Sequence, residues 1–228
     1  MLDGRIAECA AEVARLADEV LGRAGCDEEA LARLMVAVGE RVQATVASGR
    51  SAGEPDPACA QGCATCCTVN VGTLPLEGAA AAAFLRRGLR PEEAAGRAAG
   101  LLRFHEEVRW QDDGERIRRR ARCPFLDVRG GCAIHPARPL ACRSLSSLDA
   151  EECRAALQER GEGDGPGLIR MSLLQQAVCA EALAALTGVL ARRGLDARLR
   201  DVSGMAGAFL ADPARAAAFA AGARVPIE

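Results

Sequence analysis

The sequence contains neither lysine nor tyrosine, and it has few aromatic residues of any kind. All 29 of its basic residues are arginine, so the chain cannot form a lysine Schiff base or supply the lysine of a phosphate-binding P-loop. Catalysis by a tyrosine acid is excluded as well. Aromatic residues make up 3% of the chain and the formal net charge is −2, which disfavours a nucleic-acid-binding function.

Long uncharged apolar runs are also missing. No stretch of the sequence approaches the roughly 18 apolar residues that a membrane-spanning helix needs. The first residues, MLDGRIAECAAEVARLADEV, mix acidic and basic residues with apolar ones, so they lack the pattern of a secretory signal peptide. We therefore expect a cytoplasmic protein that makes no contact with a membrane.

Cysteine is what the sequence has in quantity. The chain has 228 residues, of which 50% are hydrophobic and 26% charged, a composition typical of a globular protein with a buried core. Its 11 cysteines cannot all pair within the chain, because the number is odd. In a reducing compartment, clustered cysteines favour metal-binding or redox chemistry over structural disulfides.

Hydrophobic spacing predicts a mainly α-helical chain with little β-structure. Apolar residues recur with the helical period over 6–22 and again after Asp27, a candidate N-cap, and together they predict a helical hairpin over 1–50. After the linker-like segment SGRSAGEPDP, we expect a cysteine-cluster metal-binding domain over 56–160. We expect 166–228 to form a helical extension packed on this core. The predicted fold is a set of helices around an irregular, loop-rich cysteine core that metal stabilises.

Local patterns predict further elements inside these three parts. Pro91, followed by two glutamates, is expected at the first position of a helix, and Asp149 is expected to cap another. The expected elements are helices over 76–87, 91–110, 149–160 and 168–192, a short helix after Asp212 and Pro213, a strand within 68–74, and loop over 123–147.

Eight of the cysteines fall into two groups. The first group has the pattern C-x3-C-x2-CC in the segment CAQGCATCC, and the second has the pattern C-x8-C-x9-C-x10-C after a long, mainly helical gap. These spacings predict thiolates that converge on metal. The candidate metal ligands are Cys59, Cys63, Cys66, Cys67, Cys123, Cys132, Cys142 and Cys153.

The spacing of the first group can place its thiols on one side of the chain. If 59–67 is helical, three of its cysteines share a face, and a loop can offer the same geometry. Cys66 and Cys67 are adjacent, so their side chains diverge. They could serve two neighbouring centres, or one of them could be a supporting or resolving thiol. Eight thiols allow two four-thiolate sites, or one four-thiolate cluster and a second set with another role.

Other residues near the cysteines have simpler interpretations. An anionic thiolate centre needs compensating cations, and we expect Arg138 and Arg143, which lie inside the second group, to face it. The basic run IRRRAR before Cys123 is interpreted mainly as a solvated helix face. His135 is interpreted as a packing or turn residue, and His105 as a partly buried helix residue. The three remaining cysteines are interpreted as small hydrophobic residues on helix faces: Cys9, Cys26 and Cys179.

The sequence resembles the CxxCxxCC family, also called the YkgJ-type cysteine-cluster family or zinc- or iron-chelating domain. The resemblance covers about 56–160, and its most specific part is CAIHPARPLACR, which holds the pairs Arg138-Pro139 and Cys142-Arg143. It implies that the eight clustered cysteines are the ligands. The first spacing here is x3 where the family name has x2, and His135 stands where such proteins often have another ring. Flagellin lysine N-methylases share a cysteine cluster of this kind, but the chain shows no glycine-rich S-adenosylmethionine loop after a clear strand.

Three functions are compatible with these features. The first is a metal-binding protein that holds zinc or an iron–sulfur cluster, with iron–sulfur favoured because the spacing is uneven and includes a CC pair. The second is a metal- or cluster-dependent enzyme, protein-modifying and distantly methylase-like. The third is a thiol–disulfide redox protein that uses Cys63-x-x-Cys66, although the expected βαβ context is missing. The flanking helices could bind a protein partner or form a homodimer.

Overall fold

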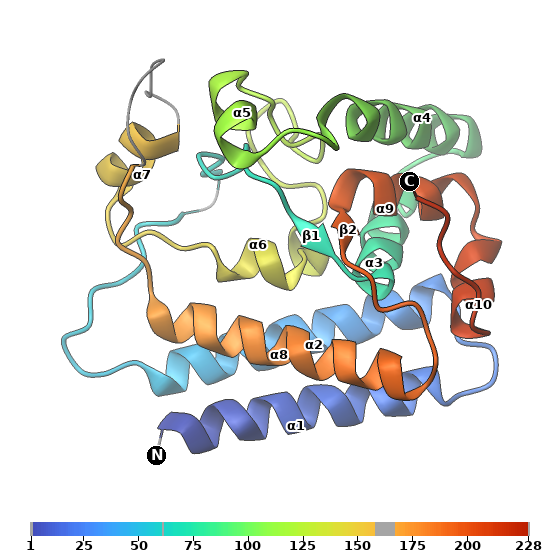
Figure 1. The fold of residues 1–228 in the computed structure, drawn as a ribbon, viewed down its shortest axis with the longest axis horizontal. Helices are drawn as coiled ribbons and strands as arrows, with labels where there is room; N and C mark the ends of the chain where they lie inside the picture. Colours follow the sequence, from blue (N-terminus) through green and yellow to red (C-terminus); the bar gives the residue numbers. More distant parts are fainter. Residues whose placement is uncertain (1, 61, 158–166, 228) are drawn as a thin grey trace.

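Helices dominate the fold (Figure 1). The computed structural model describes residues 2–60, 62–157 and 167–227. Within these residues it contains ten α-helices, one short 3-10 helix and a single two-stranded sheet, which confirms the predicted mainly α-helical class. The helices are α1 (Leu2–Leu21), α2 (Glu28–Gly49), α3 (Pro75–Arg86), α4 (Pro91–Val108), α5 (Asp113–Arg118), η1 (His135–Ala137), α6 (Leu140–Ser144), α7 (Ala150–Leu157), α8 (Leu173–Arg192), α9 (Val202–Ala211) and α10 (Ala214–Ala220).

Local capping explains where several helices begin. Asp27 caps α2, as predicted, by accepting a hydrogen bond of 2.8 Å from the backbone N–H of Ala30. Pro75 and Pro91 occupy the first positions of α3 and α4, where a missing N–H costs nothing. Asp112 caps α5 through the N–H of Glu115.

The helices pack in layers around one hydrophobic core. Helices α1, α2 and α8 run side by side, α3 packs on α2, α9 packs on α3, and α4 covers α9 (Figure 1). Buried side chains from the first 50 residues and from the last 60 belong to the same core as those of α3 and α4. The three-part division of the chain stays a prediction.

The sheet joins two segments that are distant in the sequence. Strand β1 (Gly72–Thr73) pairs antiparallel with β2 (Arg200–Asp201), with Gly72 opposite Asp201. The predicted strand within 68–74 is thus confirmed over two residues only. Because β2 leads directly into α9, the sheet fixes the start of that helix beside the segment that follows the first cysteine group.

Several expected elements differ from the structure. Helix α8 begins at Leu173, where Ser172 caps it, and not at 168. Helix α9 was not predicted, because nine of its ten residues are buried and it shows no amphipathic period. The expected loop over 123–147 contains two short helices. The first, η1, includes Pro136, and the second, α6, begins directly after Pro139. The expected helix over 149–160 is present up to Leu157, and its last residues lie outside the described part of the chain.

Helix α8 corrects the expectation that no stretch approaches a membrane span. Its 20 residues are long and apolar enough to cross a membrane by length and composition, a test that core helices of soluble proteins also pass. In the structure α8 packs on α1, α2 and α6, and its buried residues include Val178, Leu186 and Leu190.

Candidate metal centre

The two cysteine groups meet at one cavity. The cavity has a volume of about 630 Å³ and lies between the loop 59–67, the loop 123–135, α6 and the segments around β1 and β2. Seven of the eight candidate ligands line it: Cys59, Cys63, Cys66, Cys67, Cys123, Cys132 and Cys142. Residues far apart in the sequence therefore place their thiols around a common space.

The first cysteine group sits in a series of tight turns, so the described residues of this segment, 59–60 and 62–67, do not form the helical alternative. The backbone N–H of Cys63 bonds the carbonyl of Ala60, and that of Cys67 bonds the carbonyl of Ala64, both at 3.0 Å. Gly62 has φ +84°, a conformation that favours glycine. The turns leave the thiols directed toward the cavity without a regular element to space them.

A hairpin-like turn presents two thiols of the second group. Leu126 and Cys132 form an isolated antiparallel bridge. Asp127 closes the turn, because its Oδ1 accepts hydrogen bonds from the N–H groups of Arg129 at 2.8 Å and Gly131 at 2.7 Å. The turn places Cys123 and Cys132 at the same cavity.

Hydrogen bonds between the two groups hold them together. The backbone N–H of Cys123 donates to the carbonyl of Cys67 at 2.7 Å, and the thiol of Cys67 is hydrogen-bonded to those of Cys66 and Cys123. On the other side, the N–H of Ser147 donates to the sulfur of Cys59 at 3.4 Å. The first group is thus bonded to the second segment at both of its ends.

Helix α6 brings Cys142 into the cavity, and two buried charges hold this helix. Glu77 is fully buried, and its carboxylate accepts hydrogen bonds from the N–H groups of Leu140 at 2.7 Å and Leu74 at 2.9 Å. Arg143 donates to the backbone carbonyls of Arg138 and Pro136. The guanidinium of Arg143 thus supports the backbone that leads into α6, and its positive charge also opposes the upward pKa shift of Cys132.

The thiols of the cavity hold their protons strongly in this arrangement. The hydrogen bond with Cys123, together with burial, raises the pKa of Cys67 to about 12. A hydrogen bond with Cys67 and burial raise the pKa of Cys66 further, and burial has the same effect on Cys142. The positive charge of Arg138 opposes the upward pKa shifts of Cys66 and Cys142. Arg138 therefore offsets negative charge on the thiols, as predicted.

Cys153 reaches the first cysteine group from another side. It is buried on α7 and does not line the cavity, but burial and the neighbouring thiols of Cys66, Cys63 and Cys59 raise its pKa to about 11. All eleven cysteines are free thiols, without a disulfide. Within the described residues, no three His, Cys, Asp or Glu side chains are already arranged to hold one ion. The thiols converge, and a bound metal would have to draw them closer.

The remaining sequence candidates lie elsewhere or have other roles. Cys9, Cys26 and Cys179 are buried in the helical core. His135 is exposed in η1 at the cavity, which suits a turn residue. His105 is buried on α4, with Nδ1 3.3 Å from Oδ1 of Asp201.

Four residues at the site were not singled out from the sequence. Arg116 directly precedes the run IRRRAR, interpreted as a solvated face, yet Arg116 is 3% exposed and lines the cavity. Asp201 lines the cavity too, and Asn70 accepts a hydrogen bond from Arg116. Glu77 is not part of the cavity lining, but it accepts a hydrogen bond from the N–H of Leu140 at the start of α6. No local pattern marks these residues, because Asn70 lies 46 positions from Arg116 and Glu77 lies 63 positions from Leu140.

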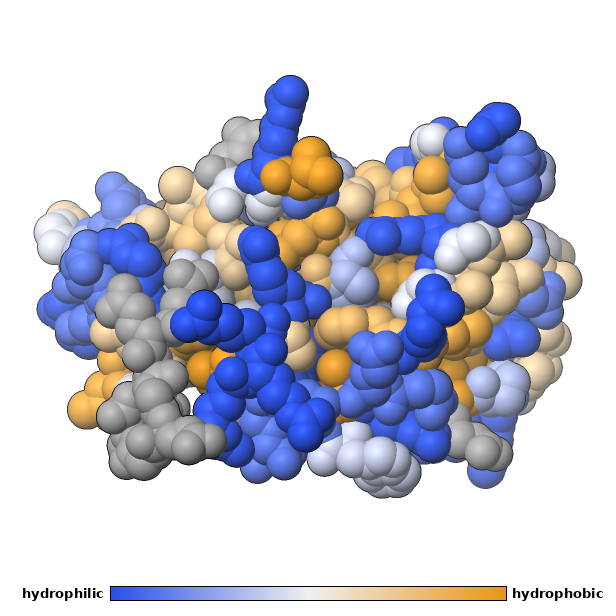
Figure 2. All heavy atoms as spheres, turned by 90° about the horizontal axis from the view of Figure 1, so that it is seen from above, coloured by the Kyte–Doolittle hydropathy of each residue, from blue (hydrophilic) through white to orange (hydrophobic). Residues whose placement is uncertain are grey.

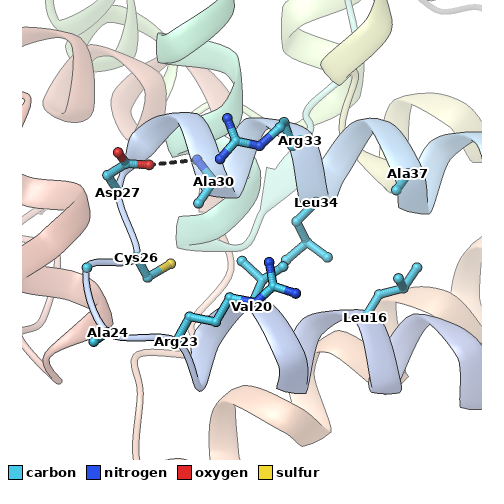
Figure 3. A pocket seen from close by; sticks show the side chains of 11 residues that line it. Leu16, Val20, Arg23, Ala24, Cys26, Asp27, Ala30, Arg33, Leu34 and Ala37 are labelled. Carbon is cyan, nitrogen blue, oxygen red and sulfur yellow. Dashed lines mark hydrogen bonds between the residues drawn. The ribbon is translucent and has the colours of Figure 1, made fainter.

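The cysteine cavity differs from a second hollow of the protein in the residues that line it. Seen from the α4 side, apolar surface lies recessed between hydrophilic side chains (Figure 2). A second hollow of about 320 Å³ lies between α1 and α2, where Leu16, Val20 and Leu34 face one another beside Cys26 (Figure 3). This hollow contains one cysteine and no acidic residue besides the helix cap Asp27, so its described lining lacks the donor set of a metal site.

Comparison with known proteins bears on the cysteine-rich segment alone. Residues 58–159, just under half of the chain, match the family model CxxCxxCC, which is described as a "Putative zinc- or iron-chelating domain". No curated protein and no solved structure matches the chain.

Proposed function

Residues 58–159 belong to the CxxCxxCC family, and from this we propose that the chain binds zinc or iron through the thiols that surround the cavity. One observation carries the proposal: seven free thiols from two distant segments line a single space. The donor set fits both metals, because thiolates are the usual ligands of structural zinc and of iron–sulfur clusters.

We further propose that the eight thiols form two sets of four, with Cys67 in the first set and Cys66 in the second. Electrostatic coupling supports this division. Apart from its hydrogen bond with Cys66, the thiol of Cys67 interacts with Cys123 and Cys132. The thiol of Cys142 interacts more strongly with Cys132 and Cys67 than with Cys66. The first set is therefore Cys67, Cys123, Cys132 and Cys142.

The second set collects the outer thiols. Cys153 is coupled to Cys66, Cys63 and Cys59, in that order of strength. Cys66 and Cys67 contact each other through their thiols, so the two sets are neighbours. The adjacent cysteines, whose side chains diverge, would thus serve two centres.

The bound metal would act first as a cross-link. It offsets part of the negative charge of the thiolates that it binds, and its binding free energy becomes folding free energy because loops without regular structure supply most of the ligands. Arg138 contributes a positive charge beside Cys66, Cys132 and Cys142, which lowers the cost of burying an anionic centre.

The identity of the metal can be tested by anaerobic purification followed by visible absorption and by metal and sulfide analysis. We favour iron–sulfur, so we expect a coloured protein with acid-labile sulfide. A colourless protein with stoichiometric zinc would establish zinc in its place. A protein that takes up neither metal would contradict the proposal.

Single substitutions test the division into two sets. We expect Cys142→Ser to lose the metal of the first set and retain that of the second, and Cys153→Ser to do the reverse. Cys179→Ser is the matched control, because Cys179 is a buried thiol on α8 away from the cavity lining. Loss of all metal in both variants would indicate a single centre, and metal retained in full in both would contradict the ligand assignment.

A further inference from the structure

One part of the cavity lining, a wall around Arg116, consists mainly of described residues other than cysteine. Apolar side chains of Val69, Val71, Phe104 and Val202 form most of this wall. Arg116 lies among them on α5. The cavity volume of about 630 Å³ lies in the range of small-molecule sites, which are mostly apolar with a few polar groups. A metal centre at the cysteines would leave this wall facing open space.

Arg116 is buried here with most of its hydrogen-bonding capacity unused. Its side chain is 3% exposed. Among the described residues, one bond is made, from Nη1 to Oδ1 of Asn70 at 3.0 Å, whereas a guanidinium has five N–H donors. Its Nε is buried without a partner in the part of the chain that the structure describes. Because unsatisfied buried donors of a charged group are costly, this arrangement points to a missing acceptor.

The nearest carboxylate does not satisfy Arg116. Oδ2 of Asp201 lies 3.6 Å from Nη1, beyond hydrogen-bond distance. The other oxygen of Asp201 is engaged as the cap of α9, where it accepts from the N–H groups of Ser203 and Gly204, and it also lies beside His105. Asp201 thus balances the charge of Arg116 while leaving its donors free.

The face of the guanidinium is fixed by an aromatic ring. Its central carbon lies 5.5 Å from the ring centroid of Phe104, a cation–π contact. Asn70 and Phe104 together hold the planar group in place from two sides. An acceptor with two oxygens in one plane is the natural complement of such a preoriented fork.

We propose that this wall binds a small organic carboxylate. The carboxylate accepts hydrogen bonds from the free donors of Arg116, and the apolar body of the ligand lies on Val69, Val71 and Phe104. Since Asp201 offsets the charge of Arg116, directed hydrogen bonds and not net charge would select the ligand. This inference goes beyond metal binding and holds for either metal.

A matched pair of probes tests the proposal on the unaltered protein. We would titrate the protein near neutral pH with 4-methylpentanoate and with 4-methylpentanamide, its neutral analogue of the same shape, by calorimetry. We expect the acid to bind at least about tenfold more tightly than the amide. Equal affinity for the two probes, or no saturable binding of either at millimolar concentration, would overturn the proposal.

Variants of two arginines on α5 locate the binding. Arg116→Lys keeps a cation beside Asp201 but lacks the planar fork, so we expect it to fold and to lose about tenfold in affinity for the acid. Arg118→Gln is the matched control, because Arg118 is exposed on the same helix, and we expect affinity within about twofold of the parent. Unchanged affinity in Arg116→Lys would overturn the proposal.

Metal content, measured on the same samples, separates this site from the cysteine centre. We expect the preference for the acid to persist after the metal is removed, provided that the circular dichroism spectrum is unchanged. Binding that disappears with the metal but survives Arg116→Lys would place the carboxylate on the metal and overturn this inference alone. A protein that takes up neither zinc nor iron and still prefers the acid would contradict only the proposed metal centre.

Discussion

Glu77 shows how a single buried residue can position the cysteine site without touching it. Its carboxylate connects the start of α3 to the start of α6, the helix that carries Cys142. Burial raises the pKa of Glu77 to about 7 from its ordinary value of 4.5, even though two backbone N–H groups and Arg143 favour the charged form. Between these two pH values the folded protein therefore binds more protons than the unfolded chain.

This shift determines the sign of a pH dependence. The contribution of Glu77 to stability is largest below pH 4.5 and is lost as the pH rises through 7, by a total on the order of 3 kcal/mol. Glu77→Gln removes this pH dependence. It also leaves the N–H of Leu74 or Leu140 facing the NH2 group of the glutamine side chain, which lowers the free energy of unfolding by roughly 1–3 kcal/mol more.

Urea unfolding of both proteins at several pH values between 5 and 8 measures this effect. We expect the stability difference between the parent and Glu77→Gln to shrink as the pH rises. Comparing the two proteins removes the contributions of the histidines, which both share. A difference that stays constant or grows with pH would show that Glu77 is ionised throughout.

The packing of elements depends on one close approach between α3 and α9. A Cβ atom at Gly78 of α3 would lie 2.1 Å from Cγ of Met205 and 3.3 Å from its backbone carbonyl carbon. Met205 is itself buried in the middle of α9. Glycine at this position therefore lets the two helices touch, and α9 in turn brings β2 and Asp201 to the cavity.

We expect Gly78→Ala to separate these helices at a cost of about 1–3 kcal/mol, since it overpacks a filled core. Gly96→Ala on α4 is the control, because a Cβ atom at Gly96 would meet nothing within 4 Å among the described residues and alanine is the better helix former by about 1 kcal/mol. Chemical denaturation measures both changes. Equal effects of the two substitutions would show that the close approach does not limit the packing.

The whole molecule is organised so that distant segments share the cavity. The loops 59–67 and 123–135, helix α6 and the residues around β2 meet there, although the sequence separates them widely. Turns and single hydrogen bonds connect these segments more than helices or strands do. Metal bound at the cysteines would thus stabilise the arrangement of the entire middle of the chain.

Removing the metal tests stability at this scale. At metal concentrations of about a thousand times the dissociation constant, binding would stabilise the fold by about 4 kcal/mol. We therefore expect a chelator to lower the melting temperature by about 10 °C. Because the metal-free thiols are protonated at neutral pH, metal uptake should also release protons and strengthen as the pH rises.

Calorimetry in buffers of different ionisation enthalpy measures the proton release. The control is Cys179→Ser, which should release as many protons as the parent, whereas Cys142→Ser should release fewer. A melting temperature that is unchanged by chelation, together with heats that do not depend on the buffer, would contradict a thiolate centre.

Much of the helical framework could be predicted because local signals specify it. The hairpin of α1 and α2 follows from apolar spacing and the Asp27 cap, and the start of α4 follows from Pro91. The resemblance of the cysteine segment to the CxxCxxCC family could also be recognised, since the order and spacing of the cysteines do not depend on conformation. The ligand set itself stays a prediction.

Features that depend on burial could not be predicted from local sequence patterns. Helix α9 has no polar face, so its period is invisible in the sequence. Arg116 looks like the exposed arginines of the run IRRRAR that follows it. It is buried because the fold brings Asn70, Asp201 and Phe104 around its side chain.

By itself, then, the sequence determined the helical class and the match of the cysteine segment to the CxxCxxCC family model, because residue type and spacing carry that information. Only the tertiary structure decided that both cysteine groups face one cavity and that a buried arginine lines it too. The physical reason is that burial and long-range proximity arise from packing, and the order of residues does not encode them in any local pattern.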